Sequence, residues 1–544
     1  MKKWTALCLS LVLALAMLLT SVSAFAEGLG GLPDKWWEAA DLQPSETFYV
    51  EGGMTVTAMG VHFNQYPTEF DGCYYFPSIE KLTGMHFDID WRTDIDYGTQ
   101  VATTLANGIE NLPDMIHPGG GYSQSVLANE GAIIALDDYL DLIPNIVEAV
   151  GEDRMSNWRA ADGHIYTIPT IVNVPGSQTM AIRKDWLDAL GMDMPTTWEE
   201  WKAYWYAVRD NDMNGNGDKS DEIPLVLEMG ATGERCLHQL LNAFGIKASN
   251  DAQFCVLEDG TYTMVYEHPR YREFLTEVQK LYADGIIDPE FDTRYLAEVY
   301  PTMSGNLAGS EFIWAEQQAV HTETLNASGD EDALYLSCAP ITGPYGDQWI
   351  QMRQGLTPNW CITVKAEQEG KVENILKFWN WQFSEEGRRL YNYGLEGYTY
   401  DIVDGVEVLR YDVVKNGFND YRTLGMEFEP FGGDWQNNAF MQCVFSGKTV
   451  DDLTIPRKSF YDGLNENGVN AGHYYAMPPT LETDAYVEYH GELITGGNGV
   501  CTLRDQCIAG QLTVDEFFAK YEALKDRGLQ DVLDEGNEAY QLIK

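Results

Sequence analysis

Basic side chains are scarce in this sequence. Its 544 residues include 35 lysines and arginines against 84 aspartates and glutamates, which gives a formal net charge of −49 at pH 7. A field of this sign repels nucleic acids and anionic membrane surfaces. It also argues against strongly anionic ligands, unless a local cluster of arginines binds them. The composition therefore excludes nucleic acid as a partner.

Common catalytic motifs are missing as well. The sequence contains no G-x-S-x-G, no H-E-x-x-H, no phosphate-binding P-loop and no C-x-x-C. Paired carboxylates stay open, because 84 acidic residues produce accidental pairs, and a glycoside hydrolase needs two carboxyl groups about 5–9 Å apart. We favour a protein that is not an enzyme, and a secreted carbohydrate-active hydrolase or lyase is the alternative.

Cysteines are few for the length of the chain. Apart from Cys8, the sequence has eight cysteines scattered along the chain. Their spacing is typical neither of a zinc site nor of a small disulfide scaffold. They are Cys73, Cys236, Cys255, Cys338, Cys361, Cys443, Cys501 and Cys507. Export permits disulfides. Cys501 and Cys507 are the candidate pair, and buried free thiols are the alternative.

A long apolar run occurs only at the N-terminus. Lys2 and Lys3 precede the apolar stretch Ala6 to Leu19, and Ala24-Phe25-Ala26 fits the small-x-small rule for cleavage before Glu27. Residues 1–26 are therefore predicted to be a signal peptide. No later segment reaches about 20 apolar residues, the length needed to span a membrane. We expect a secreted, extracellular protein that is monomeric. Cys8 lies too early to be an acylated cysteine at the cut, so anchoring stays open.

What is present indicates a large globular protein. Hydrophobic residues make up 44% and aromatic residues 12%, and the length allows two to four domains. Short apolar runs that alternate with helical patterns predict an α/β fold. Thr55 to Met59 reads as the first strand of a parallel sheet, and Glu373 to Phe383 reads as a helix. Expected strands also include His86–Trp91, Leu112–Ile116, Leu334–Pro340 and Trp360–Val364.

The stretch from Met180 to Leu225 carries the densest signals. Thr179 to Arg183 is predicted to be a strand, and Asp185 to Leu190 a helix that Gly191 ends. Thr196 and Glu199 then fit a capping box for the next helix. That helix places Trp198, Trp201 and Trp205 on one buried face.

An acidic loop follows this helix. Oxygen-bearing side chains alternate with glycines in it, and such an arrangement collects a hard cation such as Ca²⁺. The predicted calcium ligands are Asp212, Asn214, Asn216, Asp218, Asp221 and Glu222. The loop is not an EF-hand, because Ile223 occupies the twelfth position, where an EF-hand has glutamate. A solvated acidic turn without metal is the alternative.

Several segments resemble one known family in the family's own order. R-K-D-W-L-D-A-L-G at Arg183, N-G-N-G-D-K-S-D-E-I-P at Asn214 and A-D-G-H-I-Y-T-I-P at Ala161 resemble the large extracellular solute-binding proteins of carbohydrate ABC importers, of the alginate-oligosaccharide-binding type. The loop is one residue longer after its second glycine than in that family. Whether Ser220, Asp221 or Glu222 closes the cation site therefore stays open.

This resemblance implies a two-lobed periplasmic-binding-protein-like fold of type II. Each lobe would be a mixed or parallel sheet flanked by helices, with the ligand cleft between the lobes. Following the signal peptide, we expect a first lobe over 27–175 with a return segment over 326–392. The second lobe would take 176–325, including the loop 212–222, and 393–544 with the terminal helices.

Candidate ligand contacts follow from the predicted strand ends. His117 and Tyr122 lie in the loop H-P-G-G-G-Y after a predicted strand, where ligands of open α/β sheets bind. The glycines do not have the spacing of a phosphate-binding loop. Asn173 lies in the extended connection Thr170 to Ser177, which is the predicted first crossover between the lobes.

Four more candidates come from the resemblance and from loop position. Trp314 is placed at a strand end facing the cleft, with a position in the core as the alternative. Glu396 and Tyr398 fall in Y-G-L-E-G-Y, which resembles the family's second crossover, and a purely structural role is the alternative. Trp435 lies in the loop G-G-D-W-Q.

The predicted function is capture of an oligosaccharide and its delivery to the permease of an ABC importer. Sugars have hydroxyl groups and apolar C–H faces, so their sites combine aromatic walls with a few placed polar groups. Fifteen tryptophans and 31 tyrosines supply such walls. A binder of peptides or another solute on the same scaffold is a further alternative, and the cofactor expected is a structural Ca²⁺.

Overall fold

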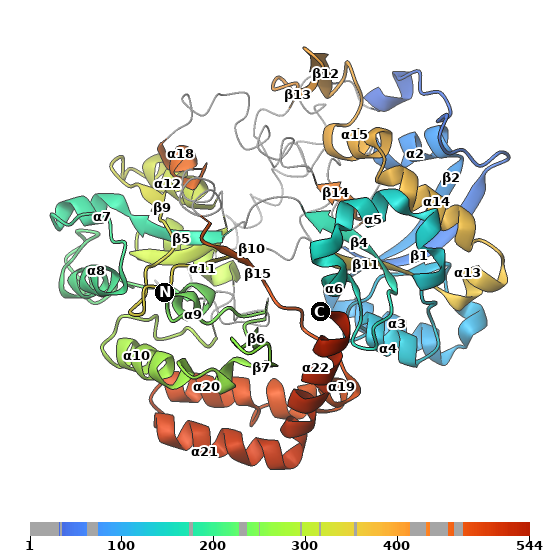
Figure 1. Ribbon diagram of the computed structural model, residues 1–544. Helices are drawn as coiled ribbons and strands as arrows, with labels where there is room; N and C mark the ends of the chain where they lie inside the picture. The colour runs from blue at the N-terminus through green and yellow to red at the C-terminus, as the bar shows by residue number, and fades with distance from the viewer. Residues whose placement is uncertain are drawn as a thin grey trace, which may run out of the picture.

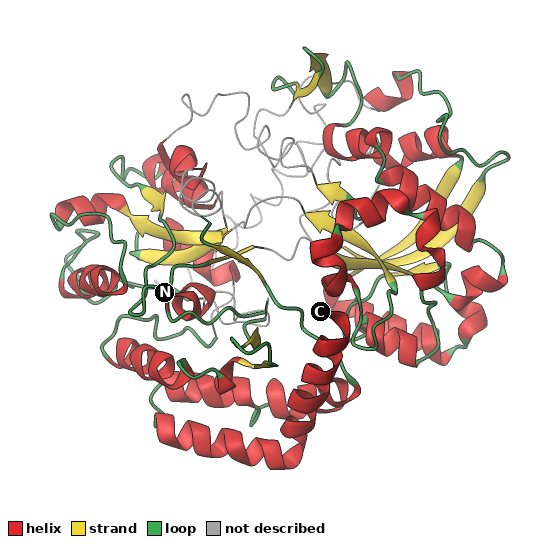
Figure 2. Ribbon diagram, in the orientation of Figure 1, coloured by secondary structure: helices red, strands yellow, loops and turns green. Residues whose placement is uncertain are grey.

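The computed structural model forms two lobes that lie side by side (Figure 1). It describes residues 32, 35–62, 74–172, 178–227, 237–249, 251–293, 296–314, 317–352, 356–413, 431–435, 455–461 and 472–544. Each lobe has a sheet with helices packed around it (Figure 2). None of the helices in these ranges combines the length and the apolar character needed to cross a membrane.

The first lobe is built on a six-stranded mixed sheet. Its order is β14-β4-β11-β3-β1-β2. β1 (Met54–His62) is parallel to β2 (Met85–Thr93) and to β3 (Met115–Ile116). β11 (Leu356–Ile362) is antiparallel to β3 and to β4 (Thr167–Val172), and β14 (Asp434–Trp435) is parallel to β4. β11 is thus the one strand of this sheet that runs against the others, which is the mixed sheet that the sequence predicts.

Helices cover this sheet and enclose its core. They are α2 (Tyr75–Thr83), α3 (Asp94–Ala106), α4 (Gln124–Asn129), α5 (Pro144–Val150), α6 (Met155–Trp158), α13 (Val364–Gln368), α14 (Val372–Gln382) and α15 (Glu385–Tyr393). The predicted helix over Glu373 to Phe383 is confirmed as α14, whose Ile375, Leu376 and Trp379 are fully buried. Ser384 caps α15 by accepting a hydrogen bond from the backbone N–H of Gly387.

The second lobe has a three-stranded sheet centred on β5 (Gln178–Arg183). β8 (Ser310–Trp314) and β9 (Tyr335–Ser337) flank it, both antiparallel. Its helices are α7 (Lys184–Ala189), α8 (Trp198–Asp210), α9 (Leu237–Ala243), α10 (Tyr271–Ala283), α11 (Leu296–Ser304), α12 (Gln317–Ala327), α18 (Ile455–Tyr461), α19 (Asp484–Tyr489), α20 (Val500–Ile508), α21 (Val514–Leu524) and α22 (Gln530–Ile543). In Figure 1, α20 and α21 lie below this lobe, where they pack against α10, and α22 packs against α19.

Three two-stranded pairs complete the described structure. β6 (Phe254–Val256) and β7 (Tyr262–Met264) form a hairpin whose turn includes Gly260, with φ of 85°. β12 (Tyr400–Val403) and β13 (Val406–Leu409) form a second hairpin on the first lobe. β10 (Ile350–Met352) and β15 (Tyr474–Ala476) are parallel and join distant parts of the chain.

Arg183 explains why the segment R-K-D-W folds as it does. Its side chain is fully buried at the end of β5, and its Nε and Nη2 atoms donate to the two carboxylate oxygens of Asp185 over 2.9 and 2.6 Å. The guanidinium also lies over the ring of Trp186, 4.5 Å from its centroid. Burial works against the charge of Arg183, but the bonds from Asp185 outweigh it and raise the pKa. A buried charge is tolerated only with partners of this kind.

The capping box of α8 lies one residue later than the sequence predicts. Thr197 is the N-cap, and it exchanges hydrogen bonds with Glu200. The predicted pair, Thr196 and Glu199, is therefore wrong. Thr196 instead adds its hydroxyl and N–H to the same Glu200 carboxylate. Two adjacent threonines followed by two glutamates satisfy the motif in either register, and burial of Trp198 selects the observed one.

The chain changes lobe at positions that differ in part from the prediction. β4 belongs to the first sheet and β5 to the second, so the first crossover lies within 173–177. β9 pairs with β5, which keeps residues 335–337 in the second lobe, after the predicted return at 326. β14 pairs with β4, which keeps 434–435 in the first lobe, after the predicted departure at 393. Strands of two or three residues have no periodicity that assigns them to a sheet.

The cysteine pair Cys501–Cys507 is not a disulfide. Both residues are buried free thiols on α20. Six residues along an α-helix advance about 9 Å and turn by about 240°, beyond what a disulfide spans. The alternative of buried thiols is the correct one for this pair, as for Cys255, Cys338 and Cys361. Cys73, Cys236 and Cys443 lie outside the described residues.

Candidate functional site

The carboxyl ends of the parallel strands of the first lobe meet at one edge of its sheet. The strands β1, β3, β4 and β14 all run in the same direction, as their pairing with one another and with β11 requires. In Figure 1 the end of the sheet that carries β4 and β14 is turned toward the second lobe. Open α/β sheets bind ligands at such edges, because the loops that follow the strands supply the contacts.

His117 lies at this edge, directly after β3. Its backbone N–H donates to the carbonyl oxygen of Met59 over 3.0 Å, and its ring packs edge-on against Trp360, with centroids 5.8 Å apart. Burial lowers its pKa to about 4, so the imidazole is neutral at pH 7. Within the described residues the buried Nδ1 atom has no hydrogen-bond partner. A neutral imidazole is suited to hydrogen bonding with uncharged hydroxyl groups.

Two tryptophans that the sequence analysis missed accompany His117. The ring centroids of Trp91, near the end of β2, and Trp360 of β11 lie 6.0 Å apart. Trp360 is fully buried, whereas Trp91 is half-buried. Gly60 of β1 makes room for them, since a Cβ atom there would lie 2.6 Å from the Trp91 ring. An isolated glycine within a strand indicates a close approach of this kind, and it is the signal that could have identified the pair.

The loop that carries Tyr122 is a tight turn. Gly119 and Tyr122 exchange two backbone hydrogen bonds of 2.9 and 3.0 Å, and Gly120 and Gly121 have φ of 61° and 87°. A Cβ atom on Gly120 would lie 2.5 Å from the backbone nitrogen of Gly98 in α3. The glycines thus serve the turn and its contact with α3, and the half-buried Tyr122 packs against the adjacent core.

Three other candidates lie at strand ends beside the crossover. Trp435 ends β14, where it pairs with Val172 of β4, and Trp314 ends β8, where it pairs with Gln178 of β5. Because β5 begins directly after the crossover, the Trp314 backbone lies at the end of the second sheet nearest to it. The side chains of both tryptophans and the whole of Asn173 lie outside the described residues, so their contacts with ligand stay predictions.

Glu396 and Tyr398 lie on a different element, the turn between α15 and β12. The Tyr398 ring is half-buried against Trp36, with centroids 5.4 Å apart, and it borders the core of the first lobe. Glu396 is exposed and its backbone bridges to Tyr400. Tyr398 therefore has a packing contact of its own, and a ligand role for either residue stays a prediction.

The acidic loop after α8 forms a compact set of oxygen atoms. Asn214 and Asn216 donate their side-chain amides to the two carboxylate oxygens of Asp221, over 3.2 and 2.5 Å. Asp212 accepts from the N–H of Gly217, and Asp218 accepts from the N–H and hydroxyl of Ser220. The positive φ of Gly215 and Gly217 allows the chain to wind around these side chains. These bonds join Asn214 and Asn216 to Asp221, whereas Asp212 and Asp218 each bond to another residue of the loop.

Glu222 closes the loop from its far end. It is 8% exposed, and its Oε1 atom accepts from the N–H groups of Met213 and Asn214 over 2.7 and 3.1 Å. Its Oε2 atom is buried and has no hydrogen-bond partner among the described residues. Ile223 donates its backbone N–H to the carbonyl oxygen of Leu307, and its apolar side chain offers no oxygen for a cation. A buried carboxylate oxygen without a donor fits a cation ligand, because such an oxygen is otherwise costly to bury.

Comparison with known proteins gives relatives of one kind. No family model matches the chain. It is 29% identical over 296 residues to the fructooligosaccharide ABC transporter substrate-binding protein FusA of Streptococcus pneumoniae serotype 4. That match spans about half of each chain, 51% in both cases. The chain is also 23% identical over 486 residues to the lipoprotein LipO of Bacillus subtilis, spanning 86% of this chain and 88% of LipO.

Solved structures extend the likeness to the whole architecture. The crystal structure of the alginate-binding protein AlgQ2 without calcium ion superposes with a TM-score of 0.69, at 21% identity, over 91% of this chain and 100% of AlgQ2. The chain has the fold of the two-lobed solute-binding proteins. FusA in complex with kestose superposes on this solute-binding fold with a TM-score of 0.66, at 22% identity, over 90% of this chain and 99% of FusA.

The resemblance that the sequence predicts is therefore confirmed. FusA and AlgQ2 are named as binding proteins. Calcium is named for AlgQ2, and an EF-hand mutant of FusA has also been solved. Among the described residues no three His, Cys, Asp or Glu side chains form a metal cluster. Four of the six predicted loop ligands are Asp or Glu, so the calcium assignment stays a prediction.

Proposed function

We propose that this protein captures an oligosaccharide outside the cell and delivers it unchanged to the permease of an ABC importer. The observation that carries the proposal is the two-lobed solute-binding fold, in which the end of the first sheet that carries β4 and β14 is turned toward the second lobe. The FusA relative, whose name states fructooligosaccharide, supports a carbohydrate as the class of ligand.

The chemistry of the edge agrees with an uncharged, hydroxyl-rich ligand. His117 is neutral at pH 7, and Trp91 presents a half-buried ring beside it. Aromatic rings stack on the C–H faces of sugars, and few charged groups are needed. Two lobes that close on a ligand shift the population toward the closed form, because only that form makes both sets of contacts. The ligand contacts proposed are His117, Tyr122, Asn173, Trp314, Glu396, Tyr398 and Trp435.

The proposal includes a calcium ion in the acidic loop. Asp212, Asn214, Asn216, Asp218, Asp221 and Glu222 would hold it, and the unsatisfied Oε2 atom of Glu222 supports this assignment. The ion would tie the end of α8 to the strand-like segment that begins at Ile223. It would thus stabilise the second lobe and have no part in ligand chemistry. Secretion by cleavage of residues 1–26, and action as a monomer, complete the proposal.

A binding screen tests the function. Thermal-shift assays of the purified protein with fructooligosaccharides, uronic-acid oligosaccharides and peptides should raise the melting temperature for one class of oligosaccharide only. Chromatography of the same mixtures should return sugars of unchanged length. A shift with peptides alone would replace the ligand class, and shortened or unsaturated products would replace binding by catalysis.

A further inference from the structure

The two lobes touch at a joint formed by the terminal helices of the second lobe. Ala161 of the first lobe packs against the core of the second. Asn129 of α4 donates its side-chain amide to Asp484 of α19 over 3.1 Å, which is a hydrogen bond from one lobe to the other. A pocket of about 300 Å³ separates the two surfaces around these contacts. The joint thus combines direct contacts with a small space.

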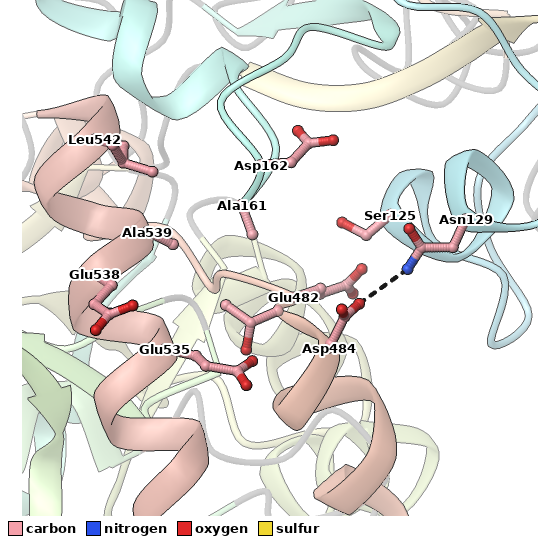
Figure 3. Close-up of a pocket in the computed structure, with 11 residues that line it drawn as sticks. Ser125, Asn129, Ala161, Asp162, Glu482, Asp484, Glu535, Glu538, Ala539 and Leu542 are labelled. Atoms are coloured by element: carbon pink, nitrogen blue, oxygen red, sulfur yellow. Dashed lines mark hydrogen bonds between the residues drawn. The ribbon is translucent and has the colours of Figure 1, made fainter.

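Carboxylates from both lobes face this pocket (Figure 3). Asp162 comes from the first lobe, and Glu482, Asp484, Glu535 and Glu538 come from the second. The described residues that line the pocket include no lysine, arginine or histidine. Like charges that face each other across a joint repel, so this contact is weakened when all five groups are ionised.

Glu482 is the carboxylate that the joint encloses most. Burial raises its pKa, and Asp251 of its own lobe raises it further, whereas Ser123 of the first lobe lowers it. Ser123 is also the N-cap of α4. Glu482 lines the pocket together with Ser125 and Asn129 of α4, and it directly precedes Thr483, the N-cap of α19.

The other charged groups around Glu482 are already engaged. Glu535 of α22 accepts from the N–H of Ala485, over 2.9 Å, and so caps α19. Asp162 accepts from the N–H of His164 and from the hydroxyl of Tyr166. Asp251 accepts from Thr480 and Ser249. Burial lowers the pKa of His490, and the negative charge of Asp251 opposes this shift.

We propose that this joint is an acid-sensitive latch between the lobes, in which protonation of Glu482 favours the contact seen here. Its geometry is that of an interface, with Asn129 hydrogen-bonded to Asp484 across it and Glu482 lining the pocket between the lobes. When the lobes separate, Glu482 is hydrated and titrates in the ordinary range of a carboxyl group, about 4.3. The touching state therefore binds the proton more tightly, and it gains population as the pH falls through the raised pKa.

Small-angle X-ray scattering on the full-length protein without ligand tests this latch. At constant ionic strength, the radius of gyration of the wild type should decrease from about pH 8 to about pH 5, because the touching state becomes more populated. Glu482→Gln carries no titratable group at this position, so its radius of gyration at the higher pH should equal that of the wild type at the lower pH. Glu522→Gln on the exposed side of α21 is the matched control and should behave as the wild type.

A second variant separates the latch from a general effect of charge. Asn129→Ala removes the hydrogen bond to Asp484 and should enlarge the radius of gyration at every pH while the pH response persists. A radius of gyration that is independent of pH in the wild type would overturn the proposal. So would a Glu482→Gln variant that keeps the pH response of the wild type. Because no sugar is present, these outcomes do not depend on the proposed function.

Discussion

Replacement of Glu222 by glutamine tests the calcium assignment most directly. Glutamine keeps the size of the side chain and one carbonyl oxygen for the N–H groups of Met213 and Asn214. It removes the negative charge and replaces one carboxylate oxygen with an amide that cannot bind a cation. The Oε2 atom of Glu222 has no hydrogen-bond donor among the described residues, so the substitution breaks no observed bond at that atom. The main loss expected is affinity for calcium.

The magnitude follows from mass action. A ligand at about 100 times its dissociation constant stabilises the folded state by about 2.7 kcal/mol. For a cooperative unit of about 150–250 residues, each kcal/mol moves the melting temperature by about 2–4 °C. Wild-type protein should therefore melt about 5–10 °C higher with saturating calcium than with a chelator. Glu222→Gln should lose most of this difference, and its melting temperature in chelator should stay near that of the wild type.

Differential scanning calorimetry provides the measurement. Glu258→Gln, an exposed carboxylate on the β6–β7 turn of the same lobe, is the control and should keep the full calcium effect. If the wild type melts at the same temperature in calcium and in chelator, the loop holds no cation. If Glu222→Gln retains the full effect, the loop binds calcium but Glu222 does not close the site.

Three further predictions follow from the packing and the buried groups. Gly60→Ala places a methyl group 2.6 Å from the Trp91 ring and should lower the free energy of unfolding by about 1–3 kcal/mol in urea titrations, whereas Gly497→Ala, with no atom within 4 Å, avoids this clash. Burial lowers the pKa of His321 to about 4, so as the pH falls the unfolded state binds a proton before the folded state does. The free energy of unfolding should therefore fall by up to about 3 kcal/mol from pH 7 to pH 4. His321→Gln should reduce this dependence on pH, measured by chemical denaturation at several pH values. Thr197→Ala should cost about 1 kcal/mol through loss of the α8 cap, and an equal loss in the exposed variant Thr276→Ala would contradict the assignment.

Much of the local structure follows from the sequence alone. The strand at Arg183, the helix over 372–382, the cap at Ser384 and the hairpin at Gly260 each rest on neighbours within a few positions. Periodicity, capping chemistry and turn residues report such contacts directly. The negative charge and the acidic loop are likewise properties of composition and spacing, and the family resemblance rests on short motifs in order.

Only the tertiary structure decides which distant elements meet. β9 joins β5, β14 joins β4, and Trp91 reaches Trp360 across Gly60, although nothing local in these short segments specifies the partner. The same holds for the joint, where Glu482 faces Ser123 from more than 300 residues away. Burial and charge at these places depend on what the fold brings together, and a sequence pattern reports only the face that a residue occupies. Composition and local pattern thus determine the elements and the class of protein, and long-range packing determines the lobe boundaries, the pKa values and the shape of the site.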